Sequence, residues 1–210
     1  MIINEWSGFL ICIEGIDGTG KSTLAKSLSK KLVSQGYDVV HSFEPTNGPH
    51  GKKIRENAVA HVDMTADEQL DLFVKDRKDH LKDLIIPSLK DGKIVILDRY
   101  FYSTIAYQGA AGYDVDKIYE IHEDFAVEPD LLCILDLDVD KALERIKKNR
   151  GGELDFFEKK DYLKKVAEIF KNDIRCKSDV VRLYADANPE DLLNDFLSIV
   201  ERSLNLDGKE

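Results

Sequence analysis

The sequence predicts an α/β protein with a central five-stranded parallel sheet that is covered by helices on both faces. Five short apolar runs alternate with longer stretches of helical periodicity, which is typical of strands buried between two helical layers. A glycine-rich loop joins the first run to the first helical stretch. Across 210 residues there is no internal repeat, low-complexity linker or break in composition. We therefore expect one domain over residues 1–210.

The five expected strands are bounded by turn residues. Gly36 precedes the second run, Asp91-Gly92 precede the third, and Pro129-Asp130 open the fourth. The runs cover residues 9–13, 37–43, 93–98, 131–137 and 180–184. Long helical patterns occupy residues 65–91 and 191–204. In such a sheet, ligands bind beyond the carboxyl ends of the strands, so chemistry is expected there.

The loop after the first strand matches the phosphate-binding pattern G-x-x-x-x-G-K-[ST]. Its sequence is Gly15-Ile16-Asp17-Gly18-Thr19-Gly20-Lys21-Ser22-Thr23, and a helical pattern follows directly. Glycines let backbone N–H groups turn inward towards an anion, and the helix N-terminus adds positive potential. Lys21 would reach the β- and γ-phosphates, while Ser22 would ligate Mg²⁺. The alternative is a plain glycine-rich turn, but the strand–loop–helix context favours a P-loop.

Composition excludes several other classes of protein. The formal net charge of −10 argues against broad contact with nucleic acid or anionic lipid. Three scattered cysteines, Cys12, Cys133 and Cys176, suit neither a disulfide framework nor a zinc site. There is no apolar stretch of transmembrane length and no signal-peptide pattern at the start. We expect a cytoplasmic protein.

Asp98 ends the third apolar run, and Arg99 follows it. An acid at this place in a P-loop protein holds Mg²⁺, directly or through water, so Ser22 and Asp98 are the candidate metal ligands. Arg99 would then face phosphates, which its planar fork suits better than a lysine would. The alternative is a turn acid beside a surface arginine.

The helical pattern over residues 65–91 carries an arginine on its apolar face. Arg77 follows Phe73 by one turn. A guanidinium in an apolar stripe is costly unless something satisfies it. A ligand that offers a carbonyl to Arg77 and a ring to Phe73 is one solution. The other makes Phe73 ordinary core and pairs Arg77 with a neighbouring carboxylate, and these residues alone do not separate the two.

From about residue 9 to the final helix the chain resembles the thymidylate kinase family, P-loop enzymes that phosphorylate dTMP with ATP. The resemblance implies a three-layer P-loop NTPase fold with a short flexible lid at about residues 146–157. The matching motifs are Glu14 to Thr23, Glu44-Pro45, Ile54-Arg55, Asp76-Arg77, Asp98-Arg99-Tyr100, Ala106-Tyr107-Gln108-Gly109, Pro129-Asp130-Leu131 and Leu135-Asp136.

The resemblance also implies site residues. Phe73 would stack on thymine, Arg77 would donate to its ring carbonyl, and Asp17 would approach the acceptor's 3′-hydroxyl. For ATP, the implied contacts are Gly15, Gly18, Thr19, Gly20, Lys21, Ser22, Thr23 and Arg145, the last against adenine. For dTMP, they are Asp17, Glu44, Pro45, Arg55, Phe73, Arg77, Arg99, Thr104, Tyr107 and Gln108. The implied catalytic set is Asp17, Lys21, Asp98, Arg99 and a lid cation.

The residue types fit these roles. A donor at Arg77 favours the O4 of thymine over the amino group of cytosine. Tyr107 is bulky enough to crowd a 2′-hydroxyl, although it would also serve as a core aromatic. An acid inside a phosphate loop needs a hydroxyl or metal partner, unless Asp17 simply forms an Asx turn.

The chain departs from the family pattern in three places. Many members have Glu-Pro-Gly-Gly-Thr where this chain has Glu44-Pro45-Thr46-Asn47-Gly48-Pro49. Neither Gly18 nor Phe156 supplies the arginine that some members carry in the P-loop or the lid. The run 145–150, Arg-Ile-Lys-Lys-Asn-Arg, holds four positive residues and no acid. It is either a solvated helix face or a basic lid, and in a lid Arg150 is our candidate for the catalytic cation.

These observations predict an ATP:dTMP phosphotransferase that uses Mg²⁺. The alternatives are a kinase for another deoxynucleoside monophosphate, such as dUMP, and a P-loop nucleotide-binding regulator without transferase activity. The resemblance implies a homodimer formed through helix faces.

Overall fold

The computed structural model describes residues 1–60, 62, 64–150 and 156–206, and the side chains discussed below lie within 1–60, 62, 64–148 and 160–205. The five predicted strands form one parallel sheet in the order β2-β3-β1-β4-β5. Their bounds are β1 (Phe9–Gly15), β2 (Val39–Phe43), β3 (Ile94–Asp98), β4 (Leu131–Asp136) and β5 (Asp179–Tyr184). The predicted strand number and direction are therefore confirmed, with ends that differ by one or two residues.

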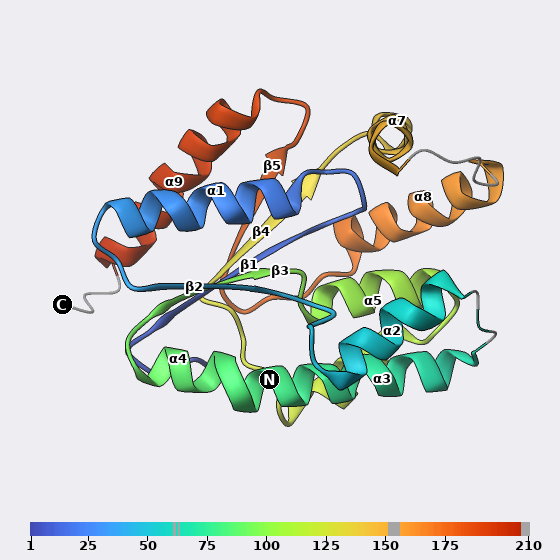
Figure 1. Cartoon of the computed structure of the whole chain (residues 1–210), viewed down its shortest axis with the longest axis horizontal. Coiled ribbons are helices and arrows are strands. Elements are labelled where there is room, and N and C mark those ends of the chain that lie inside the picture. Colours follow the sequence, from blue (N-terminus) through green and yellow to red (C-terminus); the bar gives the residue numbers. More distant parts are fainter. Residues whose placement is uncertain (61, 63, 151–155, 207–210) are drawn as a thin grey trace.

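Helices cover both faces of the sheet (Figure 1). In this view α1 and α9 lie on one face, while α3, α4 and α5 lie on the other. The bounds are α1 (Lys21–Ser34), α2 (Pro49–Val59), α3 (Ala66–His80), α4 (Ile86–Lys90), α5 (Phe101–Ala110), α6 (Val115–Glu123), α7 (Val139–Arg150), α8 (Phe156–Asn172) and α9 (Pro189–Leu206).

The buried centre of the sheet explains why the strands read as unbroken apolar runs. All of β1 is buried, from Phe9 to Gly15, and Leu10, Ile11 and Ile13 have no exposed area. Cys12 and Cys133 are also fully buried, as small core residues. Because β1 lies between β3 and β4, both of its faces meet helices, and alternation of polar and apolar residues is not needed.

The predicted helix over residues 65–91 is one continuous helix that contains a π-helical segment. Thr65 begins α3 with a capping box, in which its hydroxyl accepts from the N–H of Glu68 and the Glu68 carboxylate accepts from the N–H of Thr65. The segment Leu81–Ile85 is π-helical, and α4 continues to Lys90. The π-helical segment ends two residues before Pro87, whose nitrogen has no hydrogen to donate.

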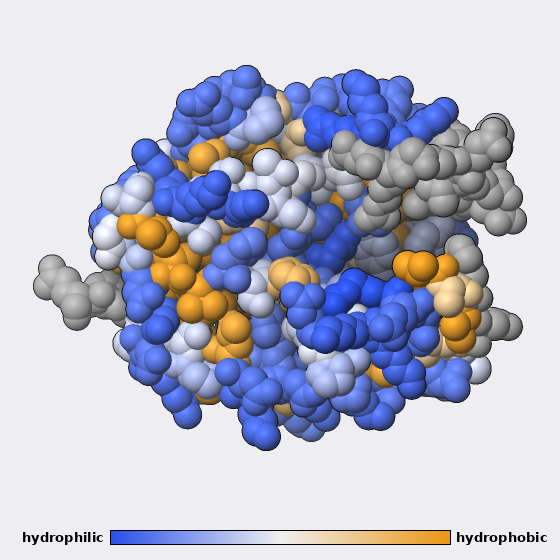
Figure 2. Space-filling view, in the orientation of Figure 1, coloured by the Kyte–Doolittle hydropathy of each residue, from blue (hydrophilic) through white to orange (hydrophobic). Residues whose placement is uncertain are grey.

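Edge strand β2 lies at the surface between α1 and α4. Figure 2 shows apolar residues gathered in this region of a mostly hydrophilic face, and Phe43 is 40% exposed. Another apolar area lies over the end of α2, where Val59 is exposed. Among the helices described, none combines the length and apolar character that a membrane span requires.

Candidate active site

The phosphate loop connects the carboxyl end of β1 to the first turn of α1. Gly15 and Gly18 have φ angles of 138° and 86°, in the range that favours glycine. A Cβ at Gly15 would lie 2.5 Å from the Leu135 carbonyl oxygen, and one at Gly18 would lie 2.5 Å from that of Ala142. Helix α7 therefore crosses directly over Gly18. This explains why no arginine side chain stands at that position in this chain.

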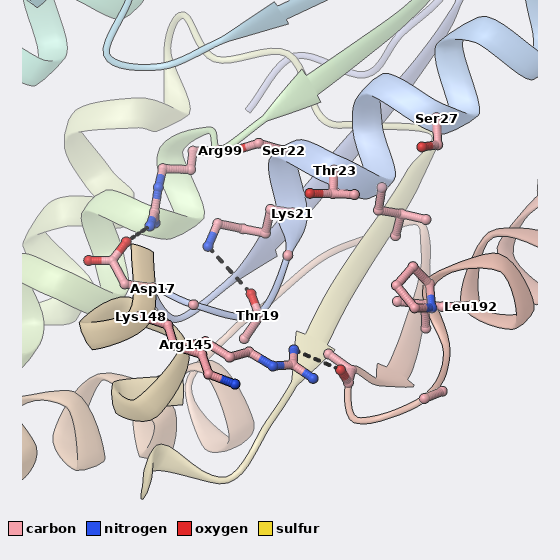
Figure 3. Close-up of a pocket in the computed structure, with 16 residues that line it drawn as sticks. Asp17, Thr19, Lys21, Ser22, Thr23, Ser27, Arg99, Arg145, Lys148 and Leu192 are labelled. Atoms are coloured by element: carbon pink, nitrogen blue, oxygen red, sulfur yellow. Dashed lines mark hydrogen bonds and ion pairs between the residues drawn. The ribbon is translucent and has the colours of Figure 1, made fainter. Parts of the chain in front are cut away.

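Lys21 points back into the loop. It is 5% exposed, and its ammonium donates to the Ile16 carbonyl oxygen at 2.7 Å and to the Thr19 hydroxyl at 3.5 Å (Figure 3). Burial, helped by the positive charge of Arg99, lowers the pKa of Lys21 to about 7. A bound anion would favour the charged form of Lys21, so this lysine is placed to bind a phosphate group.

Ser22 and Asp98 meet at the sheet edge, as predicted for metal ligands. The Ser22 hydroxyl donates to the Asp98 carboxylate. Among the residues described, no cluster of three or more His, Cys, Asp or Glu side chains forms a protein-only metal cage. A hydroxyl and a single carboxylate beside a phosphate loop nevertheless suit Mg²⁺, which keeps waters and phosphate oxygens as its other ligands. The donor set therefore fits that ion.

The first cavity, of about 590 Å³, opens around the phosphate loop. Arg145 lines it from α7, donates to the Ala185 carbonyl oxygen at 3.0 Å and lies 3.6 Å from the Asp186 carboxylate. Figure 3 shows Arg145 and Lys148 beside the loop that carries Lys21. Every predicted ATP contact lines this cavity except Gly15, which lies beneath it in the strand end. The remaining lining comes from Asp17, Leu24, Ser27, Arg99, Lys148, Ala185, Ala187, Pro189 and Leu192.

Arg99 is held in an unusual backbone conformation at the end of β3. Its φ of 70° is the only positive value among the non-glycine residues described. The buried Glu14 carboxylate stabilises the turn that follows, because it accepts from the N–H groups of Tyr100 (2.7 Å) and Ser103 (3.1 Å) and from the Ser103 hydroxyl (2.6 Å). Burial raises the pKa of Glu14. Glu14 thus fixes the start of α5 and the place of Arg99.

The guanidinium of Arg99 connects two cavities. Its Nη2 contacts the Asp17 carboxylate at 2.5 Å, and its Nη1 donates to the Ser103 hydroxyl at 2.9 Å. The Tyr107 hydroxyl lies 3.4 Å from Nη2 and accepts from the Asp17 N–H at 3.0 Å. Both Asp17 and Arg99 line the two cavities. Asp17 therefore has a charged partner, and a simple Asx turn does not account for it.

The second cavity, of about 610 Å³, lies between α2, α3, α5 and α8. All ten residues predicted to contact the acceptor line it, from six separate segments of the chain. They are Asp17, Glu44, Pro45, Arg55, Phe73, Arg77, Arg99, Thr104, Tyr107 and Gln108. Within the described part of the chain, the buried Gln108 Oε1 has no hydrogen-bond partner. It is a polar group in the wall that a ligand donor would satisfy.

The two interpretations of Arg77 each describe part of its surroundings. Arg77 is 1% exposed and pairs with the Glu44 carboxylate at 2.6 Å, as expected if it is the partner of a carboxylate. It also lines the acceptor cavity. Phe73 is only half-buried and lines the same cavity, so it is not ordinary core. Tyr107 likewise packs partly on the core and lines the cavity.

The altered segment after Pro45 has its own set of contacts. Thr46 donates to the Asp76 carboxylate through its N–H at 2.7 Å and through its hydroxyl at 2.6 Å. A Cβ at Gly51 would lie 2.0 Å from the Thr46 carbonyl oxygen, so α2 packs tightly here. Arg55 donates to the Pro45 carbonyl oxygen at 2.6 Å, which keeps its guanidinium at the cavity wall.

Sequence reasoning missed several residues that build the site. Glu14 and Ser103 hold Arg99. Glu14 belonged to the matched motif and is an acid at the end of an apolar strand, but no role was predicted for it. Tyr162 lines the acceptor cavity from α8 and donates to the Tyr107 carbonyl oxygen at 2.7 Å. His80 and His122 flank the Glu44–Arg77 pair. Apart from Glu14, which directly precedes the loop, no spacing in the sequence connects these residues to it.

The predicted lid is only partly within the described residues. Residues 146–150 continue α7, and α8 begins at Phe156. Residues 151–155 and the side chains of Arg150 and Phe156 lie outside the described part.

Comparison with known proteins matches the chain to the thymidylate kinase family model over residues 13–196. The thymidylate kinase of Brachyspira hyodysenteriae is 47% identical over 165 residues, covering 79% of this chain and 80% of that protein. The thymidylate kinase of Desulfotalea psychrophila is 48% identical over 165 residues, covering 79% and 81%. The thymidylate kinase of Xanthomonas oryzae pv. oryzae is 47% identical over 181 residues, covering 86% and 78%.

The Glu44–Arg77 pair generates a pH-dependent prediction. Burial alone would raise the pKa of Glu44, but Arg77 and His80 outweigh it, so the pKa is lowered. Stability from the ionised carboxylate is then complete above its unfolded pKa of about 4.3 and is lost as the pH falls through the lower folded value. Glu44→Gln should unfold about 3 kcal/mol more easily at pH 7, and should lose less stability than the parent between pH 5 and pH 3. Urea unfolding measures both, with exposed Glu56→Gln as the control, and parallel pH curves would contradict the pairing.

Proposed function

The chain belongs to the thymidylate kinase family, and we propose that it transfers the γ-phosphoryl group of ATP to the 5′-phosphate of dTMP, giving ADP and dTDP. The observation that carries the proposal is the meeting of two cavities at Asp17 and Arg99. One cavity surrounds a phosphate loop, and the other is lined by Phe73 together with Arg77 and Gln108. Two nucleotides placed in them would bring their phosphates to the same arginine.

The reaction requires positioning and charge neutralisation rather than a covalent intermediate. An oxygen of the acceptor phosphate forms the new bond to the γ-phosphorus. The bond between the γ-phosphorus and the β,γ-bridging oxygen breaks, and its electron pair leaves with ADP. Lys21 and Arg99 neutralise the charge of the transferring group, and the loop N–H groups hold the β-phosphate. Asp17 keeps Arg99 directed at the junction.

The donor nucleotide would lie in the first cavity. Its adenine would lie against Arg145, in the cavity that Ala185 and Ala187 also line, because a guanidinium plane stacks well on an aromatic ring. Ser22 and Asp98 would hold Mg²⁺, which when bound would neutralise phosphate charge. Lys148 adds positive charge to the same cavity. Arg150 stays our candidate for the lid cation, on the sequence argument alone.

The acceptor would lie in the second cavity with its thymine against Phe73. Arg77 and Gln108 offer a donor and an amide to the base edge, and Thr104 is buried beside them. Arg55 is suited to the 5′-phosphate, since its guanidinium is fixed at the wall. Tyr107, held by the Asp17 N–H, would crowd a ribose 2′-hydroxyl and so favour deoxyribose.

We further propose one catalytic domain over residues 1–210, a homodimer and a cytoplasmic location. These follow from the family resemblance and from the composition.

Acceptor choice tests the proposal directly. Coupled release of ADP should be fastest with dTMP among dTMP, dUMP, dCMP and dGMP, and Arg77→Ala should raise the KM for dTMP by about 10- to 100-fold, the cost of a hydrogen bond to a charged group. The KM for ATP should hold. Lys75→Ala, an exposed change on the same helix, serves as the control. Since Arg77→Ala leaves Glu44 unpaired, Arg77→Lys is measured alongside, and an unchanged KM for dTMP in both would remove Arg77 from acceptor binding.

Lys21 generates a prediction with two readouts. Lys21→Ala should fold and lower turnover by at least about 10²-fold, because phosphate stabilisation is lost. Free Lys21 has a pKa of about 7 and is mostly neutral at pH 8.5, whereas a bound polyphosphate favours its charged form, so ATP binding there should take up close to one proton. Calorimetry in buffers of different ionisation enthalpy measures that uptake. The control Lys26→Ala, an exposed change, should retain normal turnover and normal proton uptake. If proton uptake persists in Lys21→Ala, a group other than Lys21 takes up the proton.

A further inference from the structure

His122 lies behind the acceptor cavity and contacts Arg77. It comes from α6, whereas Arg77 comes from α3, and its side chain has no exposed area. Its Nε2 lies 2.7 Å from Nη1 of Arg77. His122 is not among the residues that line the cavity. Arg77 is thus the cavity-lining residue to which His122 is hydrogen-bonded.

The proton on the His122 ring is set by its second contact. Nδ1 lies 2.7 Å from the Ile118 carbonyl oxygen, which only accepts, so Nδ1 carries the hydrogen. Nε2 then presents a lone pair to Arg77, which only donates. Burial, together with the adjacent positive charge of Arg77, lowers the pKa of His122 to about 3. The ring is therefore a neutral acceptor in ordinary conditions.

Two aromatic rings fix the plane of this imidazole. Phe101 stacks on it with centroids 5.6 Å apart and planes 25° apart, and the centroid of Phe125 lies 5.3 Å away. Neither ring offers a polar group. The imidazole thus has one acceptor, in one orientation, aimed at one nitrogen of the arginine.

The other contacts of Arg77 leave little freedom. Glu44 accepts from Nε at 2.8 Å and forms an ion pair with Nη2 at 2.6 Å, and Thr104 accepts from Nη2 at 3.2 Å. With His122 on Nη1, each of the three guanidinium nitrogens has a hydrogen-bond partner. Among the described residues, His122 is the hydrogen-bond partner of Nη1, and a guanidinium Nη carries a second hydrogen. Since Arg77 lines the cavity, this hydrogen is the group it can offer to a ligand.

We propose that His122 is a positioning residue for the acceptor base, orienting Nη1 of Arg77 so that the second N–H of this nitrogen faces the acceptor cavity. The inference rests on the proposed function, since it needs Arg77 to donate to the base. It adds that a neutral histidine outside the cavity sets the direction of that donor. Without this acceptor, Nη1 has two unpaired hydrogens and the guanidinium can turn within its pocket.

A matched pair of substitutions separates positioning from packing. Asn at position 122 can still donate to the Ile118 carbonyl oxygen but is too short to reach Arg77, whereas Gln can place an oxygen near the Nε2 position. His122→Asn should weaken dTMP binding about tenfold, the scale of one charge-assisted hydrogen bond, with ATP binding changed less than about twofold. His122→Gln should recover most of the affinity. Calorimetry with dTMP and with ATP measures both, and His122→Leu replaces the Asn variant should that one not fold.

Three further proteins make the test decisive. Ile118→Ala opens a cavity on the same helix without touching Arg77, so it should lower the melting temperature and leave the ratio of dTMP to ATP affinity unchanged. The double variant Arg77→Ala/His122→Asn should bind dTMP no more weakly than Arg77→Ala alone. Normal dTMP affinity in His122→Asn beside a clear loss in Arg77→Ala overturns the role of His122 and leaves the proposed function intact. No loss in Arg77→Ala itself overturns the roles of both Arg77 and His122 in acceptor binding, whereas the absence of dTMP phosphorylation by the parent protein would overturn the proposed function.

Discussion

The geometry of the site depends on a buried carboxylate, that of Glu14, which lines neither cavity. Glu14, the penultimate residue of β1, is fully buried, and both of its carboxylate oxygens accept hydrogen bonds from the start of α5. Burying it is costly, and three donors offset that cost. The next residue, Gly15, begins the phosphate loop, and the turn that Glu14 holds begins with Arg99. One side chain therefore sets the distance between the loop and the arginine that must act on the same phosphoryl group.

The acceptor side depends in a similar way on helix α3. Asp76 and Arg77 are adjacent, and both are almost completely buried. Asp76 holds the segment at Thr46, beside which Arg55 is fixed, while Arg77 reaches the wall expected to meet the base. Helix α3 would thus fix the position of both Arg55, proposed for the acceptor phosphate, and Arg77, proposed for the base. Precise sites are better built on such elements than on free loops, and here the loops are attached to the helix by charged hydrogen bonds.

The sequence predicted the sheet and the P-loop, because strand-end motifs in a parallel sheet converge on one edge. The family resemblance supplied the ten predicted acceptor contacts, which all line the second cavity. The sequence did not predict the roles of Glu14, Ser103 or His122, because those roles arise only when distant elements pack together. It offered Arg77 as either ion-pair partner or ligand contact, and the buried guanidinium has enough donors to be paired and to line the cavity. The π-helical segment Leu81–Ile85 was also missed, because the helical periodicity of apolar residues continues across it.

The central claim is that one guanidinium, that of Arg99, serves both nucleotides. Arg99→Lys tests it most directly, because lysine keeps the charge but loses the planar fork that reaches Asp17 and Ser103 together. Single-turnover phosphoryl transfer should slow by about 10²- to 10³-fold, and separate titrations should show weaker binding of both ATP and dTMP. Weaker binding of only one nucleotide, with transfer at the normal rate, would contradict the account.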